Sequence, residues 1–378
     1  MKHIGLNERQ AGMVLNGLPH LGPVSVQRLV ERFGGSEGNL VPVFEQSSAD
    51  LQAVRGVGPE AAAAITGWEQ HFPLEREEQM LEKLGARFIL ARDPEYPRLL
   101  RETGNPPVGL YALGPREVRS PAVAIVGTRR PTLYGRTVAR RLAEDLARIG
   151  CCIVSGMARG IDAEAHEGAL DAGGSTGAVF GCGLDIVYPP EHLELYRRLS
   201  GSGVLFSEFP FGRRADRQSF PQRNRVVAGL CDAIVVVESD ARGGSMITAR
   251  FAGENGRMVF AVPGRVDQPA SRGCHQLIRD GATLLTGVDD LVQELRYMQL
   301  DLKLGDRPEA GERDDRSLGS CSAEERRILE HLDNGEVRNP DELARESGLP
   351  LYAVSASLVM LELKRLVVKR ADGAYQSR

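Results

Sequence analysis

The chain has 378 residues, of which 42% are hydrophobic and 26% charged, a composition typical of a globular protein with two or three domains. Its formal net charge of −4 argues against a generally basic nucleic-acid protein, so any site for a polyanion has to be local. The N-terminus lacks the apolar core of a signal peptide and no apolar run is long enough to cross a membrane, so we expect a cytoplasmic protein with no membrane partner.

Residues 1–75 are expected to form a helical, SAM-like domain with an internal repeat. Leu21-Gly22-Pro23 and Val57-Gly58-Pro59 each precede a helical pattern, so each copy predicts helix, tight Gly-Pro turn and helix. This arrangement is similar to the helix-hairpin-helix unit, whose turn often grips a DNA phosphate. A packing domain that touches no DNA stays equally open, because Pro23 and Pro59 each remove one N–H donor.

Residues 80–298 alternate apolar runs with helical patterns, which predicts a Rossmann-like α/β domain with a parallel sheet covered on both faces. Thr132 can cap a helix that ends at Gly150. Two short strands at 86–90 and 108–112 are expected to extend the sheet at an edge. Its main strands are expected at 124–126, 151–154, 178–180, 233–237 and 258–262. Further helices are expected at 163–172, 222–230 and 245–255.

The C-terminal quarter of the chain divides into two segments. Residues 299–320 are polar, charged and poor in large apolar side chains, which predicts a flexible linker. Residues 321–378 show three helical patterns followed by a β-hairpin, the pattern of a winged helix-turn-helix domain. The third helix of such folds often enters the DNA major groove, but residues 353–360 contain no Arg or Lys. That lack of cations favours protein contact over base reading.

Each main strand runs into a glycine-rich turn. In a parallel sheet all these turns lie at the carboxyl edge, where open α/β sheets bind ligands. Glycine lets backbone N–H groups approach a ligand closely, and the following helices point their N-termini at it. The turns also carry arginines, among them Arg129, Arg130 and Arg159, and arginine binds phosphate oxygens in a forked geometry. The ligand is therefore expected to carry several phosphates.

Individual turns suggest particular contacts. Gly127–Arg130 offers backbone donors, a hydroxyl group and two guanidinium groups, and Ser155-Gly156 with Arg159-Gly160 is expected to make a second phosphate contact. The alternative for the latter is a plain strand–helix turn in which Arg159 pairs with Asp162. Tyr134 is expected to stack on a base or cap a helix, with a core tyrosine equally open.

The basic segment 213–225 places Phe220 among arginines. A base stacked on an aromatic ring, with flanking arginines on phosphates, is the usual mode of binding single-stranded nucleic acid. The alternative is a solvated basic loop with Phe220 in the core. Asn224 is expected to read a base edge or to cap the following helix.

No catalytic residue, metal site or cofactor is assigned. Asp162 and His166 lie four apart on one helix face, but two ligands are too few for a metal, so a hydrogen bond that holds the helix start is favoured. The six cysteines show no metal-type spacing and no flanking base, so we expect buried, reduced thiols that serve packing.

Over roughly residues 80–295 the order of motifs closely resembles the DNA-processing protein A family, DprA, also called Smf, and the flanking domains fit its larger members. The resemblance rests on Gly127-Thr128-Arg129, Tyr134-Gly135, Ser155 to Asp162 with Ala165-His166, Gly181 to Asp185 with Tyr188-Pro189, Ser207-Glu208, Phe220 to Arg225, Gly244 to Ala249 and Val262-Pro263-Gly264.

The resemblance implies a Rossmann-like core that binds and protects single-stranded DNA without sequence preference, forms a homodimer through that domain, and loads the RecA recombinase during natural transformation. Two departures from the family pattern are Thr128, where serine is common, and Gly243, where a second serine is common. The predicted DNA-binding residues are Gly127, Thr128, Arg129, Arg130, Tyr134, Gly135, Ser155, Gly156, Arg159, Gly160, Arg217, Phe220, Arg223, Asn224, Arg225, Gly244 and Ser245.

An enzyme is the competing hypothesis. The glycine-rich core also resembles nucleotide phosphoribohydrolases of the lysine-decarboxylase-like group, which carry a Pro-Gly-Gly-x-Gly-Thr-x-x-Glu loop. The corresponding stretch, residues 242–249, lacks the glutamate, although Glu238 at a strand end and Glu208 in an expected loop leave an acid available. A dinucleotide-binding oxidoreductase and a Walker-type ATPase are disfavoured because neither glycine motif occurs.

Overall fold

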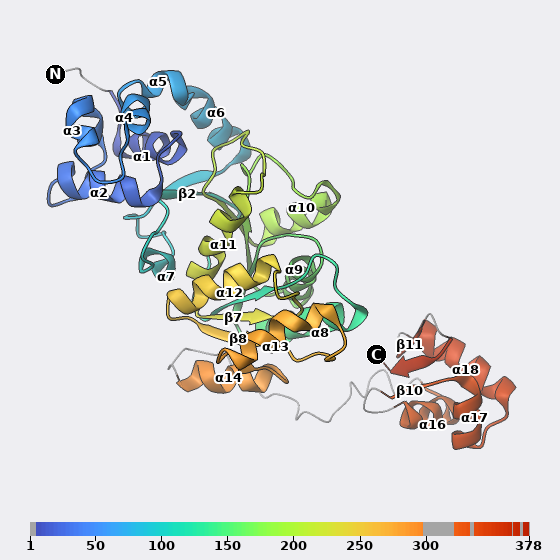
Figure 1. Ribbon diagram of the computed structural model, residues 1–378. Coiled ribbons are helices and arrows are strands. Elements are labelled where there is room, and N and C mark those ends of the chain that lie inside the picture. Colours follow the sequence, from blue (N-terminus) through green and yellow to red (C-terminus); the bar gives the residue numbers. More distant parts are fainter. Residues whose placement is uncertain (1–4, 298–320, 333–335, 365, 371–372, 378) are drawn as a thin grey trace. The chain divides into compact units, whose positions relative to one another are not determined.

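The computed structural model describes residues 5–297, 321–332, 336–364, 366–370 and 373–377 (Figure 1). The chain divides into two compact units, Met1–Leu304 and Gly305–Arg378. The predicted linker at 299–320 lies outside the described residues. Among the helices that the structure describes, none combines the length and apolarity needed to span a membrane.

The first unit begins with the predicted helical segment. Its elements are α1 (Glu8–Gly17), α2 (Pro23–Phe33), η1 (Val41–Glu45), α3 (Ser48–Gln52), α4 (Pro59–Thr66), α5 (Trp68–His71) and α6 (Leu74–Leu84). Gly22 and Gly58 are the N-caps of α2 and α4, and each following proline is the first helical residue. The second turn packs against α2, where Ser25 donates a hydrogen bond to the carbonyl of Gly56 (2.9 Å).

A nine-stranded sheet forms the core of this unit, in the order β1-β2-β6-β5-β4-β3-β7-β8-β9. The strands are β1 (Arg87–Leu90), β2 (Gly109–Leu113), β3 (Ala122–Val126), β4 (Cys152–Ser155), β5 (Thr176–Phe180), β6 (Val204–Ser207), β7 (Ala233–Val236), β8 (Met258–Ala261) and β9 (Thr283–Leu284). All pairs from β6 to β9 are parallel, whereas β2 is antiparallel to both of its neighbours. The Rossmann-like, parallel-dominated sheet and its two edge strands are therefore confirmed.

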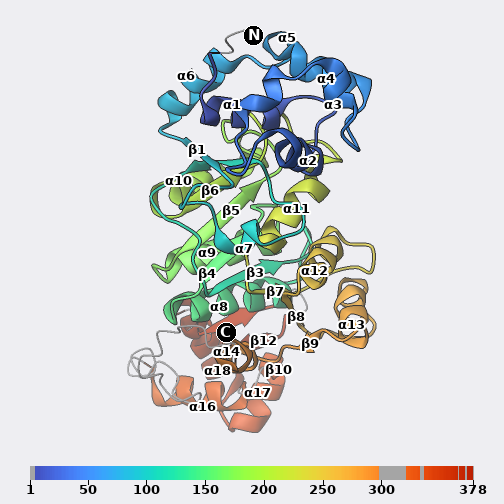
Figure 2. The same cartoon turned by 90° about the vertical axis from the view of Figure 1, so that its left-hand side faces the viewer.

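Helices cover both faces of the sheet, as Figure 2 shows from the side. They are α7 (Arg98–Arg101), α8 (Leu133–Arg148), α9 (Ile161–Asp171), η2 (Pro190–His192), α10 (Leu193–Ser202), α11 (Ser219–Gly229), α12 (Gly244–Glu254), η3 (Pro269–Ser271), α13 (Arg272–Arg279) and α14 (Val288–Tyr297). Alternate residues of β3 belong to the two cores: Val123 and Ile125 pack with α8, α9 and α14, whereas Ala122 and Ala124 pack with α11 and α12.

The structure differs from the expected elements at two places that matter for the site. Val204–Ser207 forms the buried strand β6, which was not expected, and Glu208 is the first residue of the loop between β6 and α11. The sequence shows only three consecutive apolar residues here, and so short a run does not distinguish a strand from a turn. Helix α11 begins at Ser219, three residues earlier than expected, and this places Phe220 in its first turn.

The N-terminal helices contact the sheet at β1, and they also hold the segment that leads into the basic stretch. The side chain of Asn16 donates to the carbonyl of Glu208 (2.6 Å). The buried carboxylate of Glu77 accepts the N–H of Phe211 (2.8 Å), and burial raises the pKa of Glu77. The helical segment therefore positions residues 208–211 beside the carboxyl edge.

The second unit is the predicted winged helix. Helices α16 (Ala323–His331), α17 (Pro340–Ser347) and α18 (Leu351–Leu363) pack around Ile328, Leu343 and Val354, and the strands β10 (Val337–Arg338), β11 (Val367–Lys369) and β12 (Tyr375–Ser377) form a small sheet. The first two helices begin with capping boxes at Ser322 and Asn339. Helix α18 exposes Tyr352, Val359 and Met360, an apolar surface unlike that of a base-reading helix.

Two expectations about individual polar side chains have clear outcomes. All six cysteines are buried and free, and burial raises the pKa of Cys182 to about 12. His166 does not bond to Asp162; its Nδ1 lies 2.8 Å from the Thr176 hydroxyl group, which itself donates to the carbonyl of Ile153. Burial lowers the pKa of His166 to about 3.

His166 should make the stability of the chain fall in acid. The unfolded chain binds this proton near pH 6.5 and the folded chain only near pH 3, so between these values protonation favours unfolding. We expect the free energy of unfolding of the wild type to fall, relative to His166→Gln, by up to about 1.4 kcal/mol per pH unit as the pH decreases from 6 to 4. Urea unfolding across this range measures the difference. His20→Gln, at an exposed histidine, is the control and should leave the pH profile of the wild type unchanged. Parallel pH profiles for the wild type and His166→Gln would contradict the expectation.

Candidate functional site

A pocket of about 360 Å³ lies at the carboxyl edge of the sheet, beside the ends of β3 and β7. From β3 the chain order runs one way through β4, β5 and β6 and the other way through β7, β8 and β9, so the pocket occupies the switch point where open α/β sheets bind ligands. We call it the switch-point pocket. Its walls come from the turns after β3, β4 and β7 and from the first turns of α11 and α12.

The turn after β3 presents two cations. Its backbone is held against the end of β7, because the N–H of Thr128 donates to the carbonyl of Glu238 (2.7 Å). Arg129 and Arg130 are exposed, and in the described part of the chain no carboxylate lies within 4.0 Å of either guanidinium group. The guanidinium carbon of Arg129 lies 4.7 Å from the ring centroid of Phe220, within range of a cation–π contact.

The buried carboxylate of Glu238 holds the start of helix α8 beside this turn. The carboxylate of Glu238 accepts from the N–H of Thr132 (2.9 Å) and its hydroxyl group, and Thr132 in turn caps Gly135. A Cβ on Gly135 would lie 2.4 Å from Glu238, so the close approach requires glycine. Tyr134 is half-exposed, and its hydroxyl group donates to the carbonyl of Pro263 (3.0 Å). The alternative that it is a buried core residue is therefore wrong.

The deep end of the pocket holds a buried arginine next to a buried aspartate. Arg223 donates to the carbonyl of Val179 at the end of β5 (2.9 Å), and its Nε has no partner among the described residues. Asp162 accepts the N–H groups of Gly156 (3.1 Å) and Ala158 (3.3 Å). Burial raises the pKa of Asp162 and lowers that of Arg223, and the attraction between the two groups opposes both shifts.

Gly156 makes this arrangement possible. A Cβ at this position would lie only 1.5 Å from Nη1 of Arg223, so any side chain would displace the guanidinium group. The role of Gly156 is therefore close packing against a buried cation, because its own N–H group is already used by Asp162.

The basic segment forms the outer wall. The carboxylate of Asp216 accepts the N–H groups of Gln218 (2.8 Å) and Ser219 (2.7 Å), which holds the turn into α11. Arg217 on this turn is exposed and lines the pocket, with no carboxylate within 4.0 Å in the described residues. Phe220 is half-buried, so it is neither a core residue nor a fully exposed stacking surface, the two alternatives that the sequence left open. Its ring centroid lies 5.7 Å from that of Tyr188.

The turn after β7 and the start of α12 close the pocket. The buried hydroxyl groups of Ser245 and Ser239 are 2.8 Å apart. Asn224 donates to the carbonyl of Gly244 (3.2 Å) and so joins α11 to α12. Gly244 and Ser245, the first residues of α12, line the pocket. The N-terminus of a helix favours an anion, because its first backbone N–H groups lack partners within the helix.

The structure brings ten of the predicted residues to the pocket: Gly127, Thr128, Arg129, Gly156, Arg217, Phe220, Arg223, Asn224, Gly244 and Ser245. Seven others do not line it: Arg130, Tyr134, Gly135, Ser155, Arg159, Gly160 and Arg225. Arg159 pairs with Glu191 and not with Asp162, and the hydroxyl group of Ser155 donates to the carbonyl of Ile125 (2.7 Å). Sequence analysis missed Ser239 and Asp240 as lining residues, although their place directly after β7 is a usable signal.

Arg225 is committed to a different partner. It pairs with Glu208 and donates to the carbonyl of Asn105 (2.6 Å), and both charged side chains are about nine-tenths buried. Burial raises the pKa of Glu208, and the adjacent guanidinium group of Arg225 opposes this. The pair ties α11 to the segment after β6, and the predicted DNA contact of Arg225 stays a prediction.

A parallel-dominated sheet covered by helices on both faces, with an arginine-lined pocket at its switch point, defines a Rossmann-like α/β protein. The family model for DNA recombination-mediator protein A matches residues 87–296, and that for the DprA winged helix domain matches residues 310–373. The chain belongs to the DNA-processing protein A (DprA/Smf) family.

Several relatives are similar over most of the chain. It is 33% identical to protein Smf of Synechocystis sp., over 95% of this chain and 96% of that protein, and 40% identical to the putative DNA processing protein DprA of Mycobacterium tuberculosis, over 88% and 92%. The structure of DprA from Streptococcus pneumoniae matches 76% of this chain and 98% of its own with a TM-score of 0.66 and 32% identity. The structure of DprA from Helicobacter pylori, which concerns a single-stranded DNA binding mode, matches 56% of this chain and 96% of its own. Its TM-score is 0.52 and its sequence identity is 30%.

The Arg225–Glu208 pair should be important for stability. Arg225→Met leaves a buried carboxylate without its cation, so we expect a loss of about 3–5 kcal/mol in the free energy of unfolding. The double variant Arg225→Met/Glu208→Gln should lose markedly less, because no unpaired charge remains. Denaturant unfolding measures both. Arg250→Met, which breaks the exposed pair with Glu254, should cost under about 1 kcal/mol, and an equally small effect of Arg225→Met would contradict this account.

Proposed function

We propose that this chain binds single-stranded DNA without base preference through the switch-point pocket. The observation that carries the proposal is the set of cations around Phe220: Arg129 and Arg217 are exposed and have no carboxylate partner in the described residues, and Arg223 keeps an unpaired buried donor. Membership of the DNA-processing protein A family and the DNA-binding relative from H. pylori support the same ligand.

Each group has a distinct part in this proposal. Arg129 and Arg217 take the phosphates of the strand, because a guanidinium group matches phosphate oxygens bidentately. Phe220 takes a base, which replaces Arg129 on the ring or stacks beside it. The side chain of Asn224, which lines the pocket, donates one N–H to the carbonyl of Gly244, and this bond restricts its freedom to follow a base edge.

The cellular role extends this binding activity. A homodimer formed through the Rossmann-like domain would carry two switch-point pockets, so one strand could cross both. In the cytoplasm such a dimer would protect DNA that enters during natural transformation and would load the RecA recombinase onto it. The names of the curated relatives, which describe DNA processing proteins, support a role in DNA handling.

We propose a binding protein and not an enzyme. The two acids left available to a phosphoribohydrolase are both engaged outside the pocket lining: Glu208 pairs with Arg225, and Glu238 accepts from Thr132. The acids that do line the pocket are Asp162, which holds the turn after β4, and Asp240.

Charge reversal at the pocket mouth should weaken DNA binding. We expect Arg129→Glu and Arg217→Glu each to raise the dissociation constant about tenfold or more, because a charge-assisted hydrogen bond is worth about 1.5–3 kcal/mol. Each should also lower the salt slope by about 0.7, the share of one phosphate contact on a single strand. Fluorescence anisotropy of a labelled oligothymidylate across a salt series measures both quantities, with the duplex as comparison.

Arg141→Glu, on the exposed face of α8, is the matched control because it makes the same charge change away from the pocket. Unchanged affinity in the two pocket variants would reject the proposed site. Equal loss in the control would show that only net charge matters.

Recombinase loading should depend on the same residues. On DNA coated with a single-strand-binding protein, the wild-type chain should shorten the lag before RecA filaments form, and the double variant Arg129→Glu/Arg217→Glu should not. Fluorescently labelled RecA measures the lag. A wild-type chain that binds DNA tightly but leaves the lag unchanged would reject loading while keeping the binding proposal.

A further inference from the structure

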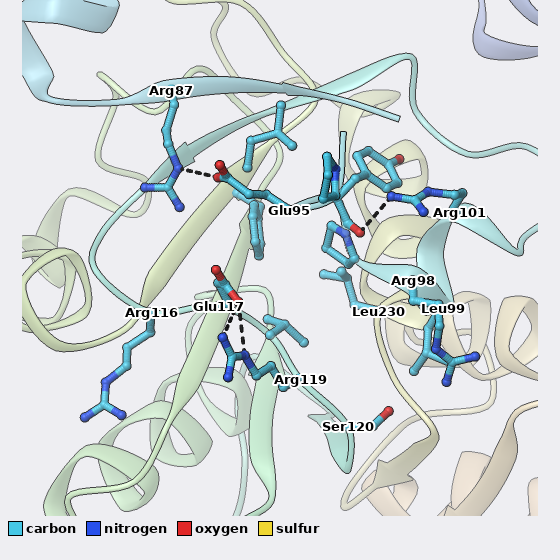
Figure 3. A pocket seen from close by; sticks show the side chains of 16 residues that line it. Arg87, Glu95, Arg98, Leu99, Arg101, Arg116, Glu117, Arg119, Ser120 and Leu230 are labelled. Carbon is cyan, nitrogen blue, oxygen red and sulfur yellow. Dashed lines mark hydrogen bonds and ion pairs between the residues drawn. The ribbon is translucent and has the colours of Figure 1, made fainter. Parts of the chain in front are cut away.

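A second pocket, of about 430 Å³, lies at the opposite edge of the sheet, at the amino ends of the parallel strands (Figure 3). Arg87 opens β1, Arg116 and Arg119 precede β3, and Leu230 precedes β7. We call it the amino-edge pocket. No residue lines both this pocket and the switch-point pocket.

The rim of the amino-edge pocket is cationic. Its lining contains five arginines and two glutamates, in a chain whose net charge is −4. Arg98 pairs with Glu102 just outside the lining (2.7 Å). Arg87 pairs with Glu95 (3.2 Å) and Arg119 with Glu117 (2.8 Å), and both pairs are largely exposed, so each exchanges readily for another anion. The guanidinium group of Arg116 has no carboxylate within 4.0 Å among the described residues (Figure 3).

The floor of the amino-edge pocket is apolar and firmly held. Leu99, Phe206 and Leu230 line it, and each is more than nine-tenths buried. Arg101 donates to the carbonyls of Ala91 (2.7 Å) and Asp93 (2.6 Å), which fixes one wall.

The opposite wall is tied to the sheet. The carboxylate of Asp232 accepts from the hydroxyl group of Ser120 (2.8 Å) and from the N–H of Ala122 (2.8 Å). The N–H of Arg116 donates to the carbonyl of Gly203 (3.1 Å). The pocket is therefore formed before any ligand arrives, as small-molecule sites usually are.

We propose that the amino-edge pocket binds a nucleoside phosphate. An apolar floor suits the face of a base, a cationic rim suits the phosphate, and the volume falls within the range of about 300–1,000 Å³ typical of small-molecule sites. Arg116 is the principal phosphate ligand, and Arg87 and Arg119 join it when their exposed glutamate partners are displaced. The nucleoside phosphate comes either from a free nucleotide or from a DNA strand that continues past the switch-point pocket; only the second source rests on the proposed function.

The test uses the full chain and two variants at the rim. Arg116→Glu reverses the charge, and Arg116→Ala removes it without adding a negative group. Arg197→Glu, at an exposed arginine of α10 outside the pocket lining, is the matched control. Binding of dAMP is measured by isothermal titration calorimetry. Binding of a short oligothymidylate, and of one several times longer, is measured by anisotropy.

Two results support the proposal and separate the sources. Binding of dAMP by the wild type that weakens at least tenfold in Arg116→Glu, and less in Arg116→Ala, assigns a free nucleotide. Weaker binding of the long oligothymidylate in Arg116→Glu, with the short one unaffected, assigns a second stretch of DNA. If neither ligand responds to Arg116→Glu, or if Arg197→Glu has an equal effect, the proposal is overturned. Failure of the switch-point proposal is distinguishable, because it appears in Arg129→Glu and with both oligothymidylates.

Discussion

The buried guanidinium group of Arg223 is the interaction on which the carboxyl edge of the sheet depends. It bonds to the end of β5, lies against the bare backbone of Gly156 after β4, and stands beside Asp162, which holds the same turn. A charge in this position is tolerated only because a carboxylate and a carbonyl surround it. Arg223 lies in α11, one turn after Phe220, so its contacts hold this helix against the ends of β4 and β5 with Phe220 in the pocket.

The arginines of the first unit fall into two groups. Some are used to build the fold: Arg225 pairs with Glu208 across two elements, and Arg101 holds a loop through backbone carbonyls. Others, such as Arg129, Arg217 and Arg116, are exposed and lack a carboxylate partner in the described residues. An acidic chain can therefore present cationic sites, because exposed arginines without a carboxylate partner can gather at one place while the acidic residues lie elsewhere.

The helical segment and the winged helix contribute in different ways. The helical segment belongs to the same compact unit as the sheet, and its Asn16 and Glu77 bond to the backbone just before the basic stretch. It therefore helps to position one wall of the switch-point pocket. The winged helix is a separate unit whose α18 exposes the apolar side chains of Tyr352, Val359 and Met360.

The sequence by itself determined the local structure: the strand-to-glycine turns, the cap at Thr132, the paired Gly-Pro turns and the winged-helix pattern all depend on residues close together in the chain. It also determined that the glycine-rich turns, with the phosphate contacts predicted for them, lie at the carboxyl edge, because parallel strands end together. Only the tertiary structure decided which arginines are free, since Arg225 meets Glu208 and Arg159 meets Glu191, residues that are 17 and 32 positions apart in the chain. The amino-edge pocket likewise depends on tertiary contacts, because its rim joins segments from β1, β3 and β7 that have no common sequence signal.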